Sequence, residues 1–222
     1  QTAALPQGAS VVHGQASITA SGTAMQVTTG TAASVINWQG FSVGRDHSVH
    51  FQQPSASSQV LNRVLGQDPS RILGSLSSNG QVWLINPNGV LFGQGARVDV
   101  AGLVASTLDI TNGDFLAGRH HLRGAIDSQA TVVNQGNIRT PFGGRVFLVG
   151  QNVQNAGAIS TPGGQTGLAA GHSVDLVDSA TPYLTLRVES RDGQVINTGT
   201  VASGRIDVHG AVVRQDGSLQ AT

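Results

Sequence analysis

The chain has 222 residues and is 39% hydrophobic, which is enough to bury a substantial core in one elongated domain. Twelve basic and twelve acidic residues cancel, and only 11% of the residues are charged, so the composition excludes the basic surface typical of proteins that bind nucleic acid or anionic lipid. The lack of cysteine excludes disulfides, thiolate metal sites and cysteine nucleophiles, and the sequence contains no apolar run of about 18 residues that could span a membrane.

Residues 1–56 alternate only weakly between polar and apolar side chains. Their one compact apolar cluster consists of Val35, Ile36, Trp38, Phe41 and Val43. The repeats further along the chain predict a solenoid, and the open end of a solenoid exposes unpaired strand edges that invite aggregation. We therefore predict that residues 1–56 form an N-terminal β cap, and that the first residues are a mature N-terminus left after cleavage of a signal peptide.

Residues 57–222 contain short strand-like segments that share one pattern. The clearest of them are 80–85, 96–101, 144–149 and 204–209. Because side chains alternate along a strand, aliphatic pairs such as Val82 and Leu84 are predicted to face inward. Trp83 and Phe147 then face outward, where we expect extra strands to cover them. Residues 164–170 fit this register poorly, and residues 68–71 are expected to form one helical turn.

A tight turn is predicted directly after the segment 80–85. Asn-Pro-Asn-Gly suits such a turn, because Pro87 fixes φ and Gly89 accepts a positive φ. The candidate motif for folding or for recognition by a partner is Asn86, Pro87, Asn88, Gly89 and Val90. Turn chemistry favours a mainly structural role and leaves direct recognition open.

Two stretches interrupt the pattern. Residues 105–131 contain Asn112-Gly113, which predicts a hairpin. Residues 175–192 contain an alternating run at 183–188, which predicts an extra strand outside the solenoid. The rungs resume at 132–174 and at 193–222.

A second phrase, Asn-x-Gly followed by a small and an aliphatic residue, recurs in the C-terminal half. Its glycines, Gly136, Gly157, Gly199 and the degenerate Gly217, are 21, 42 and 18 residues apart. A gap of 42 equals two periods of 21, so one copy is lost or replaced by an insert. The predicted ladder of corner residues is Asn134, Gly136, Asn155, Gly157, Asn197 and Gly199.

A repeat of about 20 residues with two or three short strands predicts an all-β fold, a right-handed parallel β-helix of residues 1–222. A single rung cannot bury its own apolar face, so stability must come from neighbouring rungs. No strict six-residue repeat indicates a left-handed β-helix, and no regularly spaced leucines indicate a leucine-rich horseshoe.

The segment Asn86-Pro87-Asn88-Gly89-Val90 closely resembles the NPNG motif of two-partner secretion exoproteins, the family of filamentous hemagglutinin. The resemblance extends over nearly the whole chain. Residues 35–41, 61–74 and 103–118 are similar to further family segments. An upstream NPNL motif, which many filamentous hemagglutinins carry, is missing, and this places the chain nearer the adhesin and heme-acquisition branch.

The resemblance implies a non-enzymatic secretion and targeting domain. In the family, such a domain crosses the periplasm of a Gram-negative bacterium unfolded, binds the POTRA domains of a cognate outer-membrane barrel, and folds at the cell surface. It thereby nucleates the β-helix of a passenger further along the same chain, which we expect to continue beyond Thr222. The implied partners are the transporter and this passenger, the implied state is a monomer, and no cofactor is implied.

Two alternatives to the secretion function stay open. A module that binds ligands or host cells directly is one, and an enzyme acting on polysaccharides is the other. Asp99 and Asp207 share the outer strand face, where solvated charges are a simpler explanation than catalytic acids. The four histidines His47, His50, His120 and His121 have no carboxylate at ligand spacing, so we assign no metal site and no catalytic residue.

Overall fold

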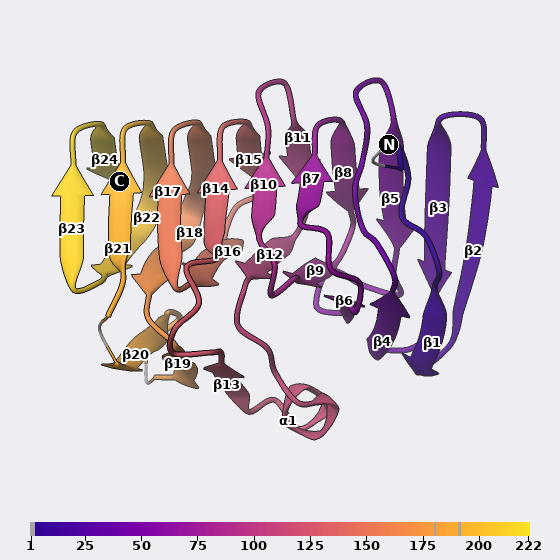
Figure 1. Ribbon diagram of the computed structural model, residues 1–222, viewed down its shortest axis with the longest axis horizontal. Helices are drawn as coiled ribbons and strands as arrows, with labels where there is room; N and C mark the ends of the chain where they lie inside the picture. The colour runs from indigo at the N-terminus through magenta and orange to yellow at the C-terminus, as the bar shows by residue number, and fades with distance from the viewer. Residues whose placement is uncertain (1–2, 180, 191) are drawn as a thin grey trace.

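The computed structural model describes residues 3–179, 181–190 and 192–222, and it confirms the prediction of an all-β parallel β-helix. Each complete rung contributes three strands, and each strand stacks on its equivalents in one of three parallel ladders (Figure 1). Within the described residues, no helix is long and apolar enough to cross a membrane.

The first ladder comprises β3 (Ala24–Thr29), β5 (Ser48–Gln52), β8 (Ser75–Ser78), β11 (Arg97–Asp99), β15 (Asn137–Arg139), the first parts of β18 (Ala158–Ala170) and β22 (Thr200–His209), and β24 (Ser218–Ala221). The second comprises β4 (Ala33–Trp38), β6 (Gln59–Val64), β9 (Gln81–Ile85), β12 (Gly102–Ser106), β16 (Arg145–Gly150) and the second parts of β18 and β22. The third comprises β7 (Ser70–Ile72), β10 (Val90–Phe92), β14 (Thr131–Asn134), β17 (Asn152–Asn155), β21 (Gln194–Asn197) and β23 (Val212–Gln215).

Antiparallel strands lie at the N-terminal end of the coil. β1 (Ser10–His13) pairs with β4, and β2 (Ala16–Ser21) pairs with β3. The parallel ladders already begin before residue 57, since β4 pairs with β6 and β5 pairs with β8. The cap is therefore continuous with the helix, and the division at residue 56 stays a prediction.

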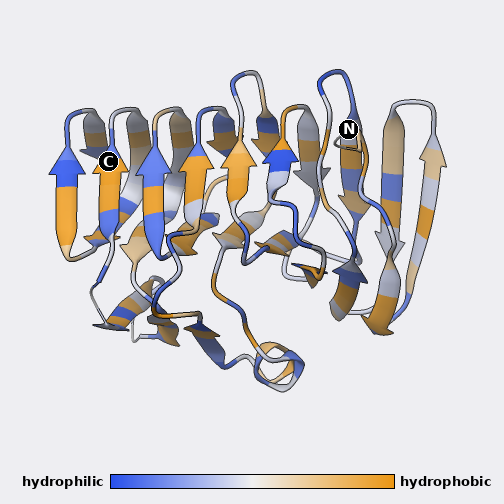
Figure 2. Cartoon of the chain, viewed as in Figure 1, coloured by the Kyte–Doolittle hydropathy of each residue, from blue (hydrophilic) through white to orange (hydrophobic). Residues whose placement is uncertain are grey.

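The interior of the coil is a column of stacked aliphatic and aromatic side chains. The predicted inward pairs are confirmed, because Val82, Leu84, Val146 and Leu148 all belong to this core and are at most 1% exposed. Burying each such side chain stabilises the fold by about 1.5–3 kcal/mol. Figure 2 shows hydrophobic and hydrophilic bands along the strands, with hydrophilic residues at several of the corners.

The structure differs from the sequence predictions at three places. Segment 96–101 belongs to the first ladder, where β11 pairs with β8, so the true equivalent of β9 in the next rung is β12. Residues 165–170, predicted to fit poorly, continue the register of β16 without a shift. Residues 68–71 form no helical turn. Instead, β7 begins at Ser70, because its backbone pairs with β10 of the next rung.

Two inserts leave the coil on one side and form a second layer (Figure 1). The first contains α1 (Asn112–Leu116) and β13 (His120–Arg123). The second contains β19 (Ser173–Asp178) and β20 (Leu184–Ser190), and β13, β19 and β20 form an antiparallel sheet. The predicted strands outside the helix are confirmed. The separation of 42 positions between Asn155 and its ladder partner Asn197 is therefore one rung plus an insert.

The hairpin predicted at Asn112-Gly113 is wrong, because these residues begin α1. The Thr111 side chain accepts a hydrogen bond from the Asp114 backbone N–H, which caps the helix. Phe115 is 4% exposed and packs edge-on against Trp83 with ring centroids 5.5 Å apart. The cap and this buried contact outweigh the local turn signal.

The second layer covers a separate apolar cluster. Trp83 and Phe147 face away from the coil, as predicted, and each is only 2% exposed. Leu176 of β19 and Leu184 and Leu186 of β20 belong to the same cluster. The outward aromatic residues of the coil thus provide the surface on which the inserts pack.

Candidate functional site

The Asn-Pro-Asn-Gly segment forms a tight turn between β9 and β10. The Gly89 N–H donates to the Asn86 carbonyl oxygen at 3.1 Å, which closes the turn. Gly89 has a φ of 131°, in the region that favours glycine, and its carbonyl accepts the Ser70 N–H at 3.0 Å. Val90, 1% exposed, then begins β10 and pairs with the strands on both sides.

Asn86 anchors this turn from inside the protein. Its side chain is fully buried, and Nδ2 donates to the Asp68 carbonyl at 2.9 Å and to Ser70 Oγ at 3.0 Å. Its Oδ1 accepts from both the backbone N–H and the Nδ2 of Asn88, each at 3.0 Å. The amide therefore fixes the turn itself and also fastens it to the corner of the preceding rung.

Pro87 and Asn88 are the exposed residues of the motif. Asn88 Nδ2 donates to the Gly66 carbonyl at 2.9 Å, and Gly66 N–H in turn donates to the Gln39 carbonyl at 3.1 Å. The corner at Gln39 is bonded to the N-terminal segment, since Gln39 N–H donates to Gln7 O at 2.9 Å. The turn is thus one layer in a continuous stack of corners that starts near the N-terminus.

The predicted asparagine ladder runs along the corners of the later rungs. Asn134 Nδ2 donates to Asn155 Oδ1 at 3.0 Å, Asn155 Nδ2 donates to Asn197 Oδ1 at 2.9 Å, and Asn197 Nδ2 donates to Gln215 Oε1 at 2.9 Å. The three asparagines are at most 2% exposed. Buried amides that bond to one another and to the backbone satisfy the corners of neighbouring rungs.

The glycines of the same corners are stacked backbone to backbone. A Cβ added to Gly157 would lie 2.2 Å from the Gly136 carbonyl oxygen, and one added to Gly199 would lie 2.1 Å from the Gly157 carbonyl oxygen. The N–H groups of Gly157 and Gly199 also donate to the Asn134 and Asn155 carbonyls of the preceding rung, whereas the Gly136 N–H donates to Asn134 Oδ1 of its own rung. One structural column is thus formed by the six predicted corner residues Asn134, Gly136, Asn155, Gly157, Asn197 and Gly199.

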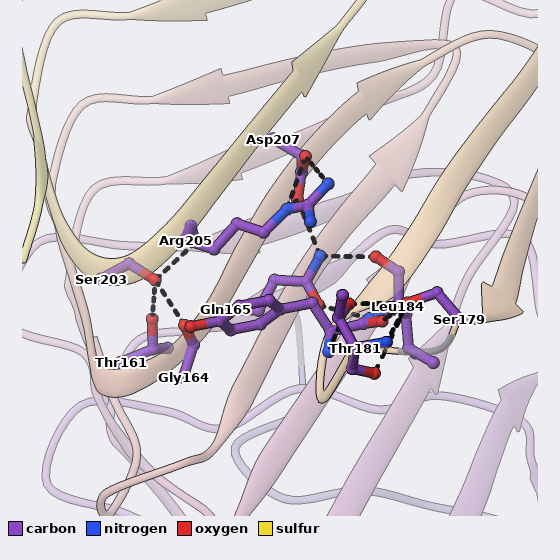
Figure 3. A network of polar contacts seen from close by, with 10 residues as sticks. Thr161, Gly164, Gln165, Ser179, Thr181, Leu184, Ser203, Arg205 and Asp207 are labelled. Carbon is purple, nitrogen blue, oxygen red and sulfur yellow. Dashed lines mark hydrogen bonds and ion pairs between the residues drawn. The ribbon is translucent and has the colours of Figure 1, made fainter.

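A polar network ties the second layer to the coil (Figure 3). Gln165, fully buried, donates from Nε2 to the Leu184 carbonyl and to Asp207 Oδ2, both at 2.7 Å, and its Oε1 accepts the Leu184 N–H at 2.8 Å. Asp207 also pairs with Arg205 at 3.1 Å, so it is a partly buried structural anion. Asp99 pairs with Arg139 at 2.6 Å in another ladder, which separates the two predicted outer carboxylates.

An arginine clamp, missed from the sequence, holds the first insert. Arg63 of β6 donates to Asp109 Oδ1 at 3.0 Å, to Asn112 Oδ1 at 2.7 Å and to the Ile110 carbonyl. Its side chain is 12% exposed. The only signal in the sequence is a charged residue within a largely buried strand, Gln59–Val64.

The predicted histidines lie in two places, with His47 and His50 at β5 and His120 and His121 in β13. His47 contacts the Arg45 carbonyl and His50 contacts Ser77 Oγ, whereas His120 packs on Trp83 with ring centroids 5.0 Å apart. Burial lowers the pKa of His120 below its ordinary value of 6.5, Arg145 acts in the same direction, and Asp178 opposes them. In the described part of the chain, no three His, Asp or Glu side chains gather as metal ligands.

The comparisons with known proteins agree on one family. The family model of the TPS secretion domain matches residues 2–220. A heme/hemopexin-binding protein of Haemophilus influenzae is 36% identical over 217 residues, which cover 92% of this chain and 23% of that protein. A second H. influenzae protein with that description is 43% identical over 86 residues, which cover 39% of this chain and 9% of that protein.

Two solved structures are similar. The HMW1 secretion domain from H. influenzae matches with a TM-score of 0.90 and 35% identity, over 96% of this chain and 58% of that one. The filamentous hemagglutinin secretion domain matches with a TM-score of 0.60 and 18% identity, over 98% of this chain and 99% of that one, and this likeness concerns the fold alone. The chain spans 23% of the length of the first curated relative.

Proposed function

Because the chain belongs to the TPS secretion domains, a non-enzymatic family that targets large exoproteins of Gram-negative bacteria for secretion, we propose that it binds a cognate outer-membrane transporter and nucleates the β-helix of its exoprotein. The observation that carries the proposal is the family match over residues 2–220. The proposed route is through the periplasm and the transporter to the cell surface.

The architecture supports folding during export. Each rung pairs with its immediate neighbours, as in the successive pairs β9–β12 and β12–β16. Rungs can therefore form one after another as residues emerge, without waiting for distant parts of the chain. Burial of each new rung on the last then opposes return of the chain into the transporter.

Within this function, the Asn-Pro-Asn-Gly turn is proposed to act mainly through folding. Asn86, Gly89 and Val90 are buried and hold the turn against neighbouring rungs. Pro87 and Asn88 alone in the motif are exposed, so they are the residues that a transporter could contact on the folded domain.

The test is export of the 222-residue chain fused to a foreign β-helical passenger, with and without the cognate transporter. We expect passenger in the medium only when the transporter is present. Equal amounts of passenger under both conditions, or none under either, would refute the targeting role.

A matched pair of variants separates folding from recognition. Asn88→Ala removes an exposed amide from the motif, and Asn137→Ala removes an exposed amide from β15. A folding role predicts near-normal export for both. If Asn88→Ala alone stops export while its thermal unfolding is unchanged, the transporter recognises this side chain directly.

The curated relatives favour a second proposal, for the exoprotein rather than this domain. Both are described as heme/hemopexin-binding proteins, and the present chain covers less than a quarter of each. We propose that any such binding belongs to a passenger outside residues 1–222. Titration of the 222-residue chain with hemin and with hemopexin should give no complex, and saturable binding of either would place the activity in this domain.

A further inference from the structure

A cleft lies between the coil and the second layer. Its volume is about 430 Å³, within the range of small-molecule sites. The coil contributes Gln81 of β9 and Arg145 of β16, and the second layer contributes His120 of β13 and Asp178 of β19. Four polar side chains from four different strands thus converge on one hollow, although long stretches of sequence separate them.

Most hydrogen-bonding capacity of these side chains is unused within the described residues. Among these residues, the Arg145 side chain makes one hydrogen bond, from Nη2 to the Pro182 carbonyl at 3.0 Å, and pairs with no carboxylate. The side chains of Gln81, His120 and Asp178 have no hydrogen bond to any described group. This contrasts with Asp207 and Asp175, each of which is paired with an arginine.

Burial of His120 favours the neutral form of its imidazole. Its ring packs on Trp83, and burial lowers its pKa below 6.5. A neutral imidazole offers one donor and one acceptor. The cleft therefore presents amide, guanidinium, carboxylate and imidazole groups together, which suits a ligand with several hydroxyl groups.

Apolar surface lies beside these groups. Trp83, Phe147 and Leu184 form part of the cleft wall. Each of these three side chains is at most 6% exposed, so only a small apolar area faces the cleft.

We propose that this cleft binds one sugar unit of a glycan. The planar polar groups hydrogen-bond to ring hydroxyls, the apolar wall contacts the C–H face of the sugar, and Arg145 can pair with a carboxylate when the sugar carries one. This activity is independent of the proposed secretion function, since it requires only the folded domain.

The test is NMR titration of the ¹⁵N-labelled 222-residue chain with galactose, N-acetylglucosamine and N-acetylneuraminic acid. We expect a saturable shift of the Trp83 indole N–H with at least one sugar. The Trp38 indole, buried in the coil and bonded to Asn62, serves as an internal control and should stay unchanged. A preference for the acidic sugar assigns the carboxylate to Arg145, and a preference for a neutral sugar assigns binding to hydroxyl contacts.

Variants then locate the site. Asp178→Asn and Arg145→Gln should each weaken binding about tenfold or more. Arg97→Gln, in a separate groove, should leave the affinity unchanged. Because the Arg145 side chain makes a single, exposed hydrogen bond within the described residues, its variant tests the site with little effect on folding. The proposal is overturned if no sugar shifts Trp83, or if neither cleft variant changes an observed affinity.

Discussion

Replacing Asn86 by alanine tests whether one buried amide holds the Asn-Pro-Asn-Gly turn in place. The change removes the donors to the Asp68 carbonyl and Ser70 Oγ and the acceptor of the Asn88 N–H. Asp68 and Asn88 are exposed, so water can replace part of what they lose, but Ser70 is fully buried. A buried unsatisfied group costs about 1–3 kcal/mol, and each neutral hydrogen bond contributes about 0.5–1.5 kcal/mol.

These terms predict a loss of about 3 kcal/mol in the free energy of unfolding for Asn86→Ala. Asn88→Ala should lose about 0.5–1 kcal/mol, because its bond to Gly66 is exposed and the Asn88 backbone N–H still satisfies Asn86 Oδ1 after the bond between the two side chains is lost. Urea unfolding monitored by tryptophan fluorescence measures both, since Trp38 and Trp83 are at most 2% exposed. A loss below about 1 kcal/mol for Asn86→Ala, or equal losses for the two variants, would refute the reasoning.

Three further outcomes are expected. Asn155→Ala interrupts the amide ladder and should lower the free energy of unfolding by about 3 kcal/mol. A double-mutant cycle with Asn197→Ala should show coupling between the two residues, and additive losses would contradict a ladder. Gly157→Ala places a methyl group against the Gly136 carbonyl and should cost about 2 kcal/mol or more in urea unfolding, so an unchanged midpoint would disprove the close stacking. Because the pKa of His120 is lowered in the folded chain, the unfolded chain binds more protons than the folded chain as the pH drops through and below 6.5, and stability should fall there. His120→Gln should reduce this pH dependence of stability.

The sequence repeat predicted the coil because the same short pattern of strand and corner residues recurs along the chain. Glycines spaced by one rung length marked the corners, and the inward or outward side of Val82, Trp83 and Phe147 followed from alternation along a strand. The buried asparagine column also followed, since asparagine at each corner has one consistent explanation in hydrogen bonding.

Local patterns failed where a contact from another rung decided the conformation. Asn112-Gly113 starts a helix because Phe115 packs on Trp83 and Arg63 binds the insert from β6. Ser70 begins a strand because β10 supplies its pairing partner.

Residue patterns alone predict the single rung, with its approximate length, its corners and its buried side chains. Packing between rungs sets which ladder each segment joins, how the two inserts fold back over Phe147, and which polar groups meet in the cleft. The difference lies in the range of the interactions. Alternation and turn chemistry act within a few residues, whereas the meeting of His120 with Asp178 depends on packing between segments that the chain order keeps apart.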